Sequence, residues 1–149
     1  MKQFLILLMV LAPVAVLSQQ PVQWSFYAEK VRTNQYKVTL TARVQTGYHV
    51  FALTQPADAI AMPTKINIAG NPDISDIGCF TEEGMLEKVK DETFGIESWH
   101  FSDKVSFVGI VTLRGRSRTV LSGHVEFQVC SEDKCYPPTR VNFNVPLNH

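Results

Sequence analysis

The sequence predicts an all-β protein, an antiparallel β-sandwich, on three observations. Seven or more short segments alternate apolar and polar residues, which is the pattern of half-buried strands. Clusters of Gly, Pro, Asn and Ser separate these segments, as turns do in sandwiches. No long segment has convincing helical periodicity. With 149 residues and 45% hydrophobic content, the chain can bury one core, so a single domain is expected over residues 19–149.

The first 18 residues have the pattern of a cleaved signal peptide. Lys2 provides a short positive region, and an apolar run from residue 4 to residue 17 follows it. Val16 and Ser18 are small residues at the positions that a signal peptidase reads. The apolar run of about 14 residues is shorter than the ~20 that span a membrane, and an uncleaved anchor is the alternative. We therefore expect an exported protein without stable membrane insertion, in a compartment where disulfides persist.

The predicted strands of the N-terminal half are separated by polar turns and by a proline-containing loop at residues 55–63. The clearest strand pattern has its apolar side chains at even positions between residues 36 and 44. The strands expected in this half are residues 22–26, 36–44, 48–51 and 64–68.

The C-terminal half begins with an irregular stretch. Residues 73–95 contain three glycines and scattered acidic residues, so we expect loops there and at most a weak helix over residues 82–89. Ordered structure is expected to resume at residue 99. The strands expected after it are residues 104–111, 119–122, 124–129 and 140–145.

Cys130 and Cys135 bracket four polar residues between two of these strands. A short hairpin loop brings its ends together, so the two thiols can reach the Cα separation of about 4.4–6.8 Å that a disulfide requires. Alternation with Val125 and Phe127 predicts that the Cys130 sulfur faces solvent. Two interpretations are open: a structural disulfide, or a redox-active pair. The small stabilisation that so short a loop gives favours the second.

Other features of the sequence argue against nucleic-acid binding and against a metal site. The formal net charge is zero and no basic run occurs, so nucleic acid is not an expected partner. Two cysteines without a neighbouring Cys or His pair leave a zinc site incomplete, so no metal is expected. The third cysteine, Cys79, lies beside Phe80 outside any paired motif, and we expect it to be a buried, inert thiol.

Several segments together are typical of one known family. The most specific segment, residues 123–138, contains a strand, a cysteine, a short acidic loop, a second cysteine, an aromatic residue and Pro-Pro. The other matching segments are Trp24-Ser25-Phe26, Gly47-Tyr48-His49-Val50-Phe51, Asp91-Glu92-Thr93-Phe94-Gly95 and residues 101–107. With these segments the chain resembles the N-terminal periplasmic domain of DsbD, the thiol-disulfide interchange protein, in its Bacteroidetes-type form.

The resemblance implies an immunoglobulin-like sandwich in which Cys130 and Cys135 cycle between dithiol and disulfide, without a cofactor. Residues 91–95 match the cap loop, which covers the cysteines and opens when a partner docks. The implied role is that of a periplasmic protein-disulfide reductase component, which relays reducing equivalents between thioredoxin-like or DsbD-type redox proteins in trans. The side chains implied around the pair are His49, Phe51, Tyr136 and Pro137.

The chain departs from the better-known enterobacterial pattern in the cap and around the cysteines. Thr93 stands at the first of two positions that are aromatic in that pattern, which leaves Phe94 alone as the shield. His49 and Phe51 match positions that are tyrosines there. Four residues rather than five separate the cysteines. No Cys-x-x-Cys motif occurs, so we expect electrons to come from another protein.

Acidic residues surround the cysteines in sequence, with Glu132 and Asp133 in the loop and Asp91 and Glu92 in the expected cap. Carboxylates disfavour a neighbouring thiolate, so the pKa of both thiols is expected at or above the free value of about 8.5. The resemblance favours Cys135 as the cysteine that a partner engages first.

Two functions of other classes stay open. One is a non-catalytic, exported β-sandwich interaction module whose disulfide is structural. The other is a hydrolase that uses His49, His100 or His124, although no nucleophile motif accompanies these histidines.

Overall fold

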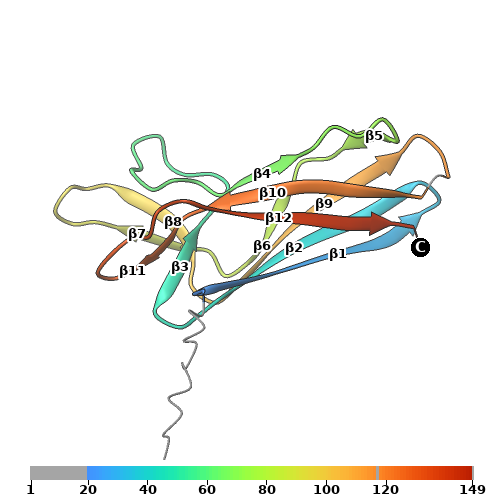
Figure 1. Ribbon diagram of the computed structural model, residues 1–149. Helices are drawn as coiled ribbons and strands as arrows, with labels where there is room; N and C mark the ends of the chain where they lie inside the picture. Colours follow the sequence, from blue (N-terminus) through green and yellow to red (C-terminus); the bar gives the residue numbers. More distant parts are fainter. Residues whose placement is uncertain (1–19, 117, 149) are drawn as a thin grey trace, which may run out of the picture.

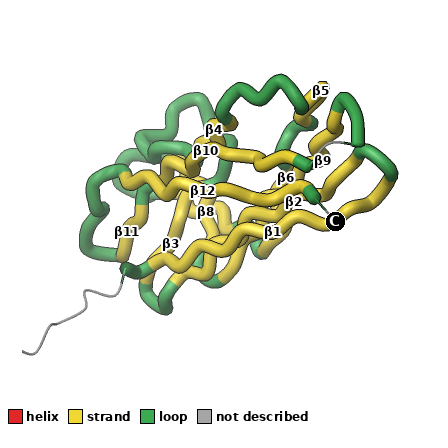
Figure 2. Tube along the Cα trace, turned by 45° about the vertical axis from the view of Figure 1, so that its right-hand side comes forward, coloured by secondary structure: helices red, strands yellow, loops and turns green. Residues whose placement is uncertain are grey.

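The computed structural model describes residues 20–116 and 118–148, and within them it contains strands and no helix (Figure 2). These strands form three antiparallel sheets. The predicted signal peptide, residues 1–18, lies outside the described residues. A helix able to cross a membrane is likewise not found in the described part of the chain.

The largest sheet consists of β1 (Val22–Arg32), β2 (Gln35–Val44), β9 (Lys104–Leu113), β5 (Ile74–Ile77) and β6 (Thr81–Gly84). β1 and β2 form a hairpin, and β2 pairs with β9 along nearly its whole length. The other edge of β9 pairs with β5 and then with β6. One face of this sheet is apolar, because along β2 every second residue is buried.

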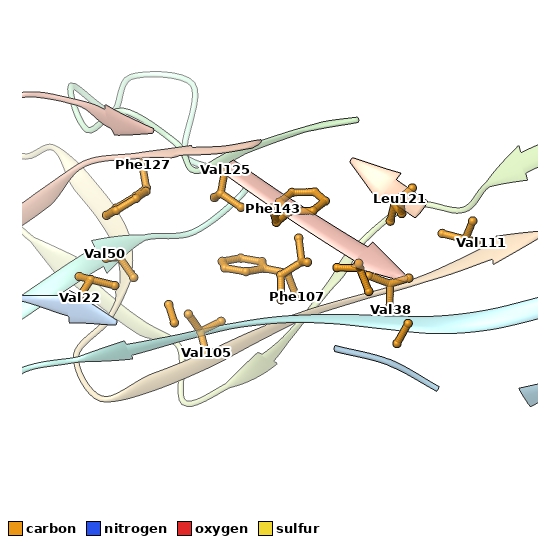
Figure 3. Close-up of a cluster of buried hydrophobic side chains, with 14 of the residues drawn as sticks. Val22, Val38, Val50, Val105, Phe107, Val111, Leu121, Val125, Phe127 and Phe143 are labelled. Carbon is orange, nitrogen blue, oxygen red and sulfur yellow. The ribbon is translucent and has the colours of Figure 1, made fainter. Parts of the chain in front are cut away.

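A second sheet packs its apolar face against the large sheet. Its strands are β12 (Thr139–Leu147), β10 (Thr119–Phe127) and β4 (Lys65–Ile68). Phe107 of the large sheet lies among side chains of the second sheet, including Val125 and Phe143, in the core between them (Figure 3). A Cβ at Gly123 would lie 2.3 Å from the carbonyl oxygen of Asn67, so only glycine there lets β4 lie against β10.

A third sheet lies at one end of the sandwich (Figure 1). We call it the end sheet. Its strands, in spatial order, are β11 (Val129–Ser131), β3 (Tyr48–Phe51), β8 (Glu97–Phe101) and β7 (Glu87–Lys90). β10 leads into β11 through the single residue Gln128. The chain therefore passes directly from the second sheet into the end sheet, where β11 contains Cys130.

The predicted all-β sandwich is confirmed, and so are the predicted strands on either side of the cysteines. β10 and β12 pair in register from Thr119 opposite Leu147 to Phe127 opposite Thr139. β10 joins the expected strand 119–122 to the first four residues of the expected strand 124–129, which is interrupted at Gln128. The expectation for residues 73–95 is wrong. That stretch contains β5, β6 and β7, and no helix forms over residues 82–89. These strands are mostly exposed, so they lack the apolar alternation that identifies a strand in sequence.

Candidate redox site on the end sheet

A disulfide joins Cys130 and Cys135, whose Cα atoms lie 4.0 Å apart. The loop between them is held by its own hydrogen bonds. The amide of Ser131 donates to the carbonyl of Lys134 at 2.8 Å. The Ser131 hydroxyl accepts hydrogen bonds from the amides of Asp133 and Lys134, each at 3.3 Å. The loop therefore holds the two cysteines opposite each other as an antiparallel bridge.

The two cysteines differ in exposure. Cys130 is 1% exposed, whereas Cys135 is exposed. The prediction that the Cys130 sulfur faces solvent is therefore wrong. It treated β10 and β11 as one strand with a solvent face, but the strand is interrupted at Gln128, whose side-chain amide donates to the carbonyl of Tyr136 at 3.1 Å. β11 belongs to the end sheet, where Cys130 lies opposite His49 of β3 and is itself buried.

A groove of about 910 Å³ runs along the end sheet beside the disulfide. Cys135, Ser131 and Glu132 of the cysteine loop form part of its wall. Ile60 and Ala61 line it from the loop after β3, and the turn between β7 and β8 contributes further residues. A fourth part of the lining is formed by Gly47, Tyr48, His49 and Phe51. The accessible sulfur thus lies in a concave surface built from four separate parts of the chain.

Strand register places one row of side chains on the groove face of the end sheet. Cys130 lies directly opposite His49 of β3, and Phe51 of β3 lies opposite His100 of β8. His100 in turn lies opposite Glu87 of β7. Directly opposite residues project to the same face, so this row crosses all four strands beside the disulfide.

The two histidines of this row stack on each other, with ring centroids 4.1 Å apart. Glu87 holds His100, because its Oε2 lies 3.5 Å from the His100 Nε2. The Nδ1 of His100 is buried and has no hydrogen-bond partner among the described residues. Burial, and then the neighbouring His100, lower the pKa of His49 to about 4, against an opposing effect of Glu87. His49 is therefore neutral at pH 7.

Two tyrosines lie beside the cysteine loop. The rings of Tyr48 and Tyr136 have centroids 6.1 Å apart. A hydrogen bond between their hydroxyls raises the pKa of Tyr48 and lowers the pKa of Tyr136. The Nζ of Lys134 lies 4.8 Å from the centroid of the Tyr136 ring, a cation–π arrangement. The cation of the loop is thus held against Tyr136.

The predicted cap, residues 91–95, is the turn of the β7–β8 hairpin. The Oδ1 of Asp91 accepts hydrogen bonds from the amides of Thr93 and Phe94 at 2.8 and 3.0 Å. Gly95 has a φ of +67°, a left-handed conformation that favours glycine. Asp91 and Phe94 line the same groove as Cys135, and the Phe94 side chain is 75% exposed. In this conformation the groove is open.

A family model described as the N-terminal domain of the thiol:disulfide interchange protein DsbD matches residues 15–147. The chain belongs to this family. Among solved structures, the reduced N-terminal domain of DsbD from Neisseria meningitidis has a TM-score of 0.50 and 16% identity, with 85% of this chain and 86% of that chain covered.

Two further structures share the fold of this DsbD N-terminal domain. A chain from the complex between the DsbD and PilB N-terminal domains of Neisseria meningitidis has a TM-score of 0.54 and 15% identity, with 89% of this chain and 88% of that chain covered. The N-terminal periplasmic domain of ScsB from Proteus mirabilis has a TM-score of 0.57 and 18% identity, with 83% of this chain and 44% of that chain covered. The comparison with curated proteins finds no match. The fold is thus the immunoglobulin-like sandwich of DsbD N-terminal domains.

The structure brings most of the residues implied by the DsbD resemblance to the groove or its border. His49 lies half-buried beside Cys130, and Phe51 is buried next to it, with the two rings in an edge-to-face contact. Tyr136 is half-buried and Pro137 is exposed, directly after Cys135. The exposed cap residues Glu92 and Thr93 complete the hairpin turn.

The sequence analysis did not identify Glu87 as a site residue, and it considered His100 only as a candidate residue of a hydrolase. A possible signal was the alternation of Glu87, Val89 and Asp91, all of which line the groove. The third histidine of that hydrolase hypothesis, His124, lies in β10 opposite Asn142 and Asn67, in the second sheet rather than at the groove. The described residues include no group of three or more His, Cys, Asp or Glu side chains that could hold a metal ion.

The expectation for Cys79 is wrong, because its thiol is exposed. The residue lies in the connection between β5 and β6, with Phe80 next to it packed partly against the core. Side chains alternate in extended chain, so an inward Phe80 leaves its neighbour Cys79 facing outward.

Proposed function

We propose that this domain relays reducing equivalents between protein partners in the periplasm through the Cys130–Cys135 pair. The observation that carries the proposal is the asymmetry of the disulfide, in which Cys135 is exposed at the groove and Cys130 is 1% exposed. A partner thiol can approach one sulfur and not the other, so exchange has a defined order. Membership of the DsbD N-terminal family supports the same function.

Reduction of the domain takes two exchange steps. A partner thiolate attacks the Sγ of Cys135, the bond to Cys130 breaks, and Cys130 leaves as a thiolate that then takes a proton. The partner's second thiol, after losing its proton, attacks the partner sulfur of the mixed disulfide and releases Cys135. The partner leaves with its own disulfide, and the domain holds two thiols. The reverse steps transfer the electron pair to the disulfide of a second partner.

Thioredoxin-like or DsbD-type proteins are the proposed partners. Exposed apolar side chains line the groove near the sulfur, among them Ile60 at 83% and Phe94 at 75% exposure, and such patches commonly bind other proteins. The solved complex of a DsbD N-terminal domain with a PilB N-terminal domain supports protein docking by a domain of this fold.

Residues 91–95 serve as the cap of this pair. Their place at the tip of an exposed hairpin, on the groove that also holds Cys135, supports this role. In the free, reduced domain the hairpin tip folds over the groove and shields the thiols from small oxidants, and it withdraws when a partner docks. Phe94 is the aromatic side chain that this shield needs.

Replacing Phe94 with alanine is therefore expected to increase the alkylation rate of the reduced pair severalfold. Stability should change by less than about 0.5 kcal/mol, because the Phe94 ring is 75% exposed. Iodoacetamide labelling followed by mass spectrometry measures the rates, with Cys79 replaced by alanine in every protein. The matched control is Tyr27→Ala, which removes a 62% exposed ring from β1. Equal rates in Phe94→Ala and its parent would remove Phe94 from the cap.

The relay is tested by the reduction potential of the Cys130–Cys135 bond, measured by equilibrium titration against glutathione or dithiothreitol. A relay must release its electrons to partners, so its potential is expected above about −300 mV. A potential below that value would identify a structural disulfide and would favour the interaction-module alternative.

A further inference from the structure

The proposed relay requires that the Cys130 thiol lose its proton. Whenever the reduced domain gives up its electrons, Cys130 must attack the mixed disulfide on Cys135, and only its thiolate is nucleophilic. Cys130 is 1% exposed in the disulfide form, so bulk water has poor access to its proton. A buried thiol also has a raised pKa, which makes a nearby proton acceptor useful.

The end sheet places a basic side chain at this position. His49 lies directly opposite Cys130 in the β3–β11 ladder, and directly opposite residues have Cβ atoms about 4.5–5.5 Å apart on the same face. The imidazole is half-buried on the groove face, between Phe51 in edge contact and His100 in a stack. A ring held on two sides has few alternative rotamers, so it stays beside the cysteine.

We propose, on the basis of the relay described above, that His49 is the proton acceptor for the Cys130 thiol, and that His100 and Glu87 position its ring. His49 acts on a reacting group directly. His100 acts through His49 by stacking on it, and Glu87 fixes His100 with its Oε2 at 3.5 Å from Nε2.

The step balances within the site. A ring nitrogen of neutral His49 takes the proton of the Cys130 thiol and becomes imidazolium, while the Cys130 thiolate attacks the Sγ of Cys135. The Cys130–Cys135 bond forms, the bond from Cys135 to the partner sulfur breaks, and the partner leaves as a thiolate. His49 then returns its proton to the partner thiolate or to water in the open groove.

The surroundings of His49 set its protonation state. In the disulfide form the pKa of His49 is about 4, so the ring is neutral and able to accept a proton at pH 7. Glu87 favours the imidazolium once it forms, and His100 opposes it. The other ionisable groups that line this groove belong to Tyr48, Asp91, Glu132 and Cys135.

Two successive releases of a coloured thiolate from dithiobis(nitrobenzoate) separate the two steps. Attack by Cys135 on this small disulfide releases the first thiolate, and attack by Cys130 on the resulting mixed disulfide releases the second. The reduced domain is followed by stopped-flow absorbance from pH 6 to pH 10. Cys79 is replaced by alanine in every protein, because its exposed thiol would also react.

His49→Gln is expected to slow the second release about 100-fold at pH 7, the scale of general-base catalysis, and to leave the first release unchanged. The difference should shrink towards pH 10, where thiols ionise without help. His124→Gln, a half-buried histidine in β10, is the matched control and should behave as the parent. An unchanged second release, or equal slowing of both releases at every pH, overturns the assignment of His49.

A second substitution covers the case in which His49→Gln does not fold. Glu87→Gln removes the carboxylate that favours the imidazolium, at a side chain that is 43% exposed. It should slow the second release severalfold, while Glu83→Gln on β6 should have no effect. Equal rates in both would overturn the positioning role. Failure of the parent to form the mixed disulfide at all would instead contradict the relay itself, so the two proposals are distinguished.

Discussion

Cys130→Ser is expected to stop thiol–disulfide exchange after its first step. Cys135 is exposed and can still attack a disulfide, but a serine hydroxyl cannot resolve the mixed disulfide that results. The reduced variant should therefore bind one glutathione stably when it is mixed with oxidised glutathione, whereas the parent should pass through this adduct and end as its internal disulfide. Intact-protein mass spectrometry over time distinguishes the two, with Cys79→Ala in both backgrounds.

Cys135→Ser is the matched control for this experiment. It leaves only Cys130, which is 1% exposed, so its adduct should form far more slowly than that of Cys130→Ser. If the Cys135→Ser variant reacted as fast as Cys130→Ser, the order of attack would have to be reversed. Loss of reaction in both variants, with the fold intact by circular dichroism, would mean that neither thiol reaches a disulfide in solution.

Phe107→Ala is expected to cost about 3–5 kcal/mol of unfolding free energy, the usual loss for a buried aromatic. Phe107 is 0% exposed, and Trp24 stacks on it with ring centroids 5.9 Å apart. The ring lies between the two large sheets, so no side chain can move into the space without moving a strand. The melting temperature should fall by about 10 °C or more.

Urea denaturation measures this loss, and Phe94→Ala is the comparison within the same protein. Both substitutions remove one phenyl ring, but the Phe94 ring is 75% exposed and takes no part in the core. A loss in Phe107→Ala no larger than that in Phe94→Ala would contradict the packing of the two sheets around Phe107.

Strands with one buried face could be predicted because burial leaves a pattern in the sequence. Along β2, Tyr36, Val38 and Leu40 are at most 4% exposed, and the residues between them are polar. β6 and β7 leave no such pattern, because their residues are exposed or half-exposed. They are strands because the edges of β9 and β8 offer them hydrogen bonds, and those partners are remote in the sequence.

Some residues of the candidate site could likewise be predicted from the sequence, and others could not. The cysteines could be found from their spacing, and the hairpin turn that we propose as the cap could be found from its resemblance to the DsbD pattern. The resemblance also pointed to His49 and Phe51. The full row from Cys130 to Glu87 could not be predicted, because it depends on the registers of three separate strand pairs. The burial of Cys130 was missed for a local reason. Alternation passes through Gln128 in the sequence, but the backbone leaves one sheet there and enters another.

The two faces of the end sheet give neighbouring residues of β3 separate roles. Val50 is 0% exposed and packs in the core, whereas His49 and Phe51, on either side of it, line the groove. A change at position 49 alters the chemistry beside the cysteines and leaves the core residue in place. Evolution can therefore tune the reactivity of the pair and the stability of the domain almost independently. A scaffold of this kind can diversify its chemistry while keeping its fold, and the fold itself is shared with the Neisseria domain at 16% identity.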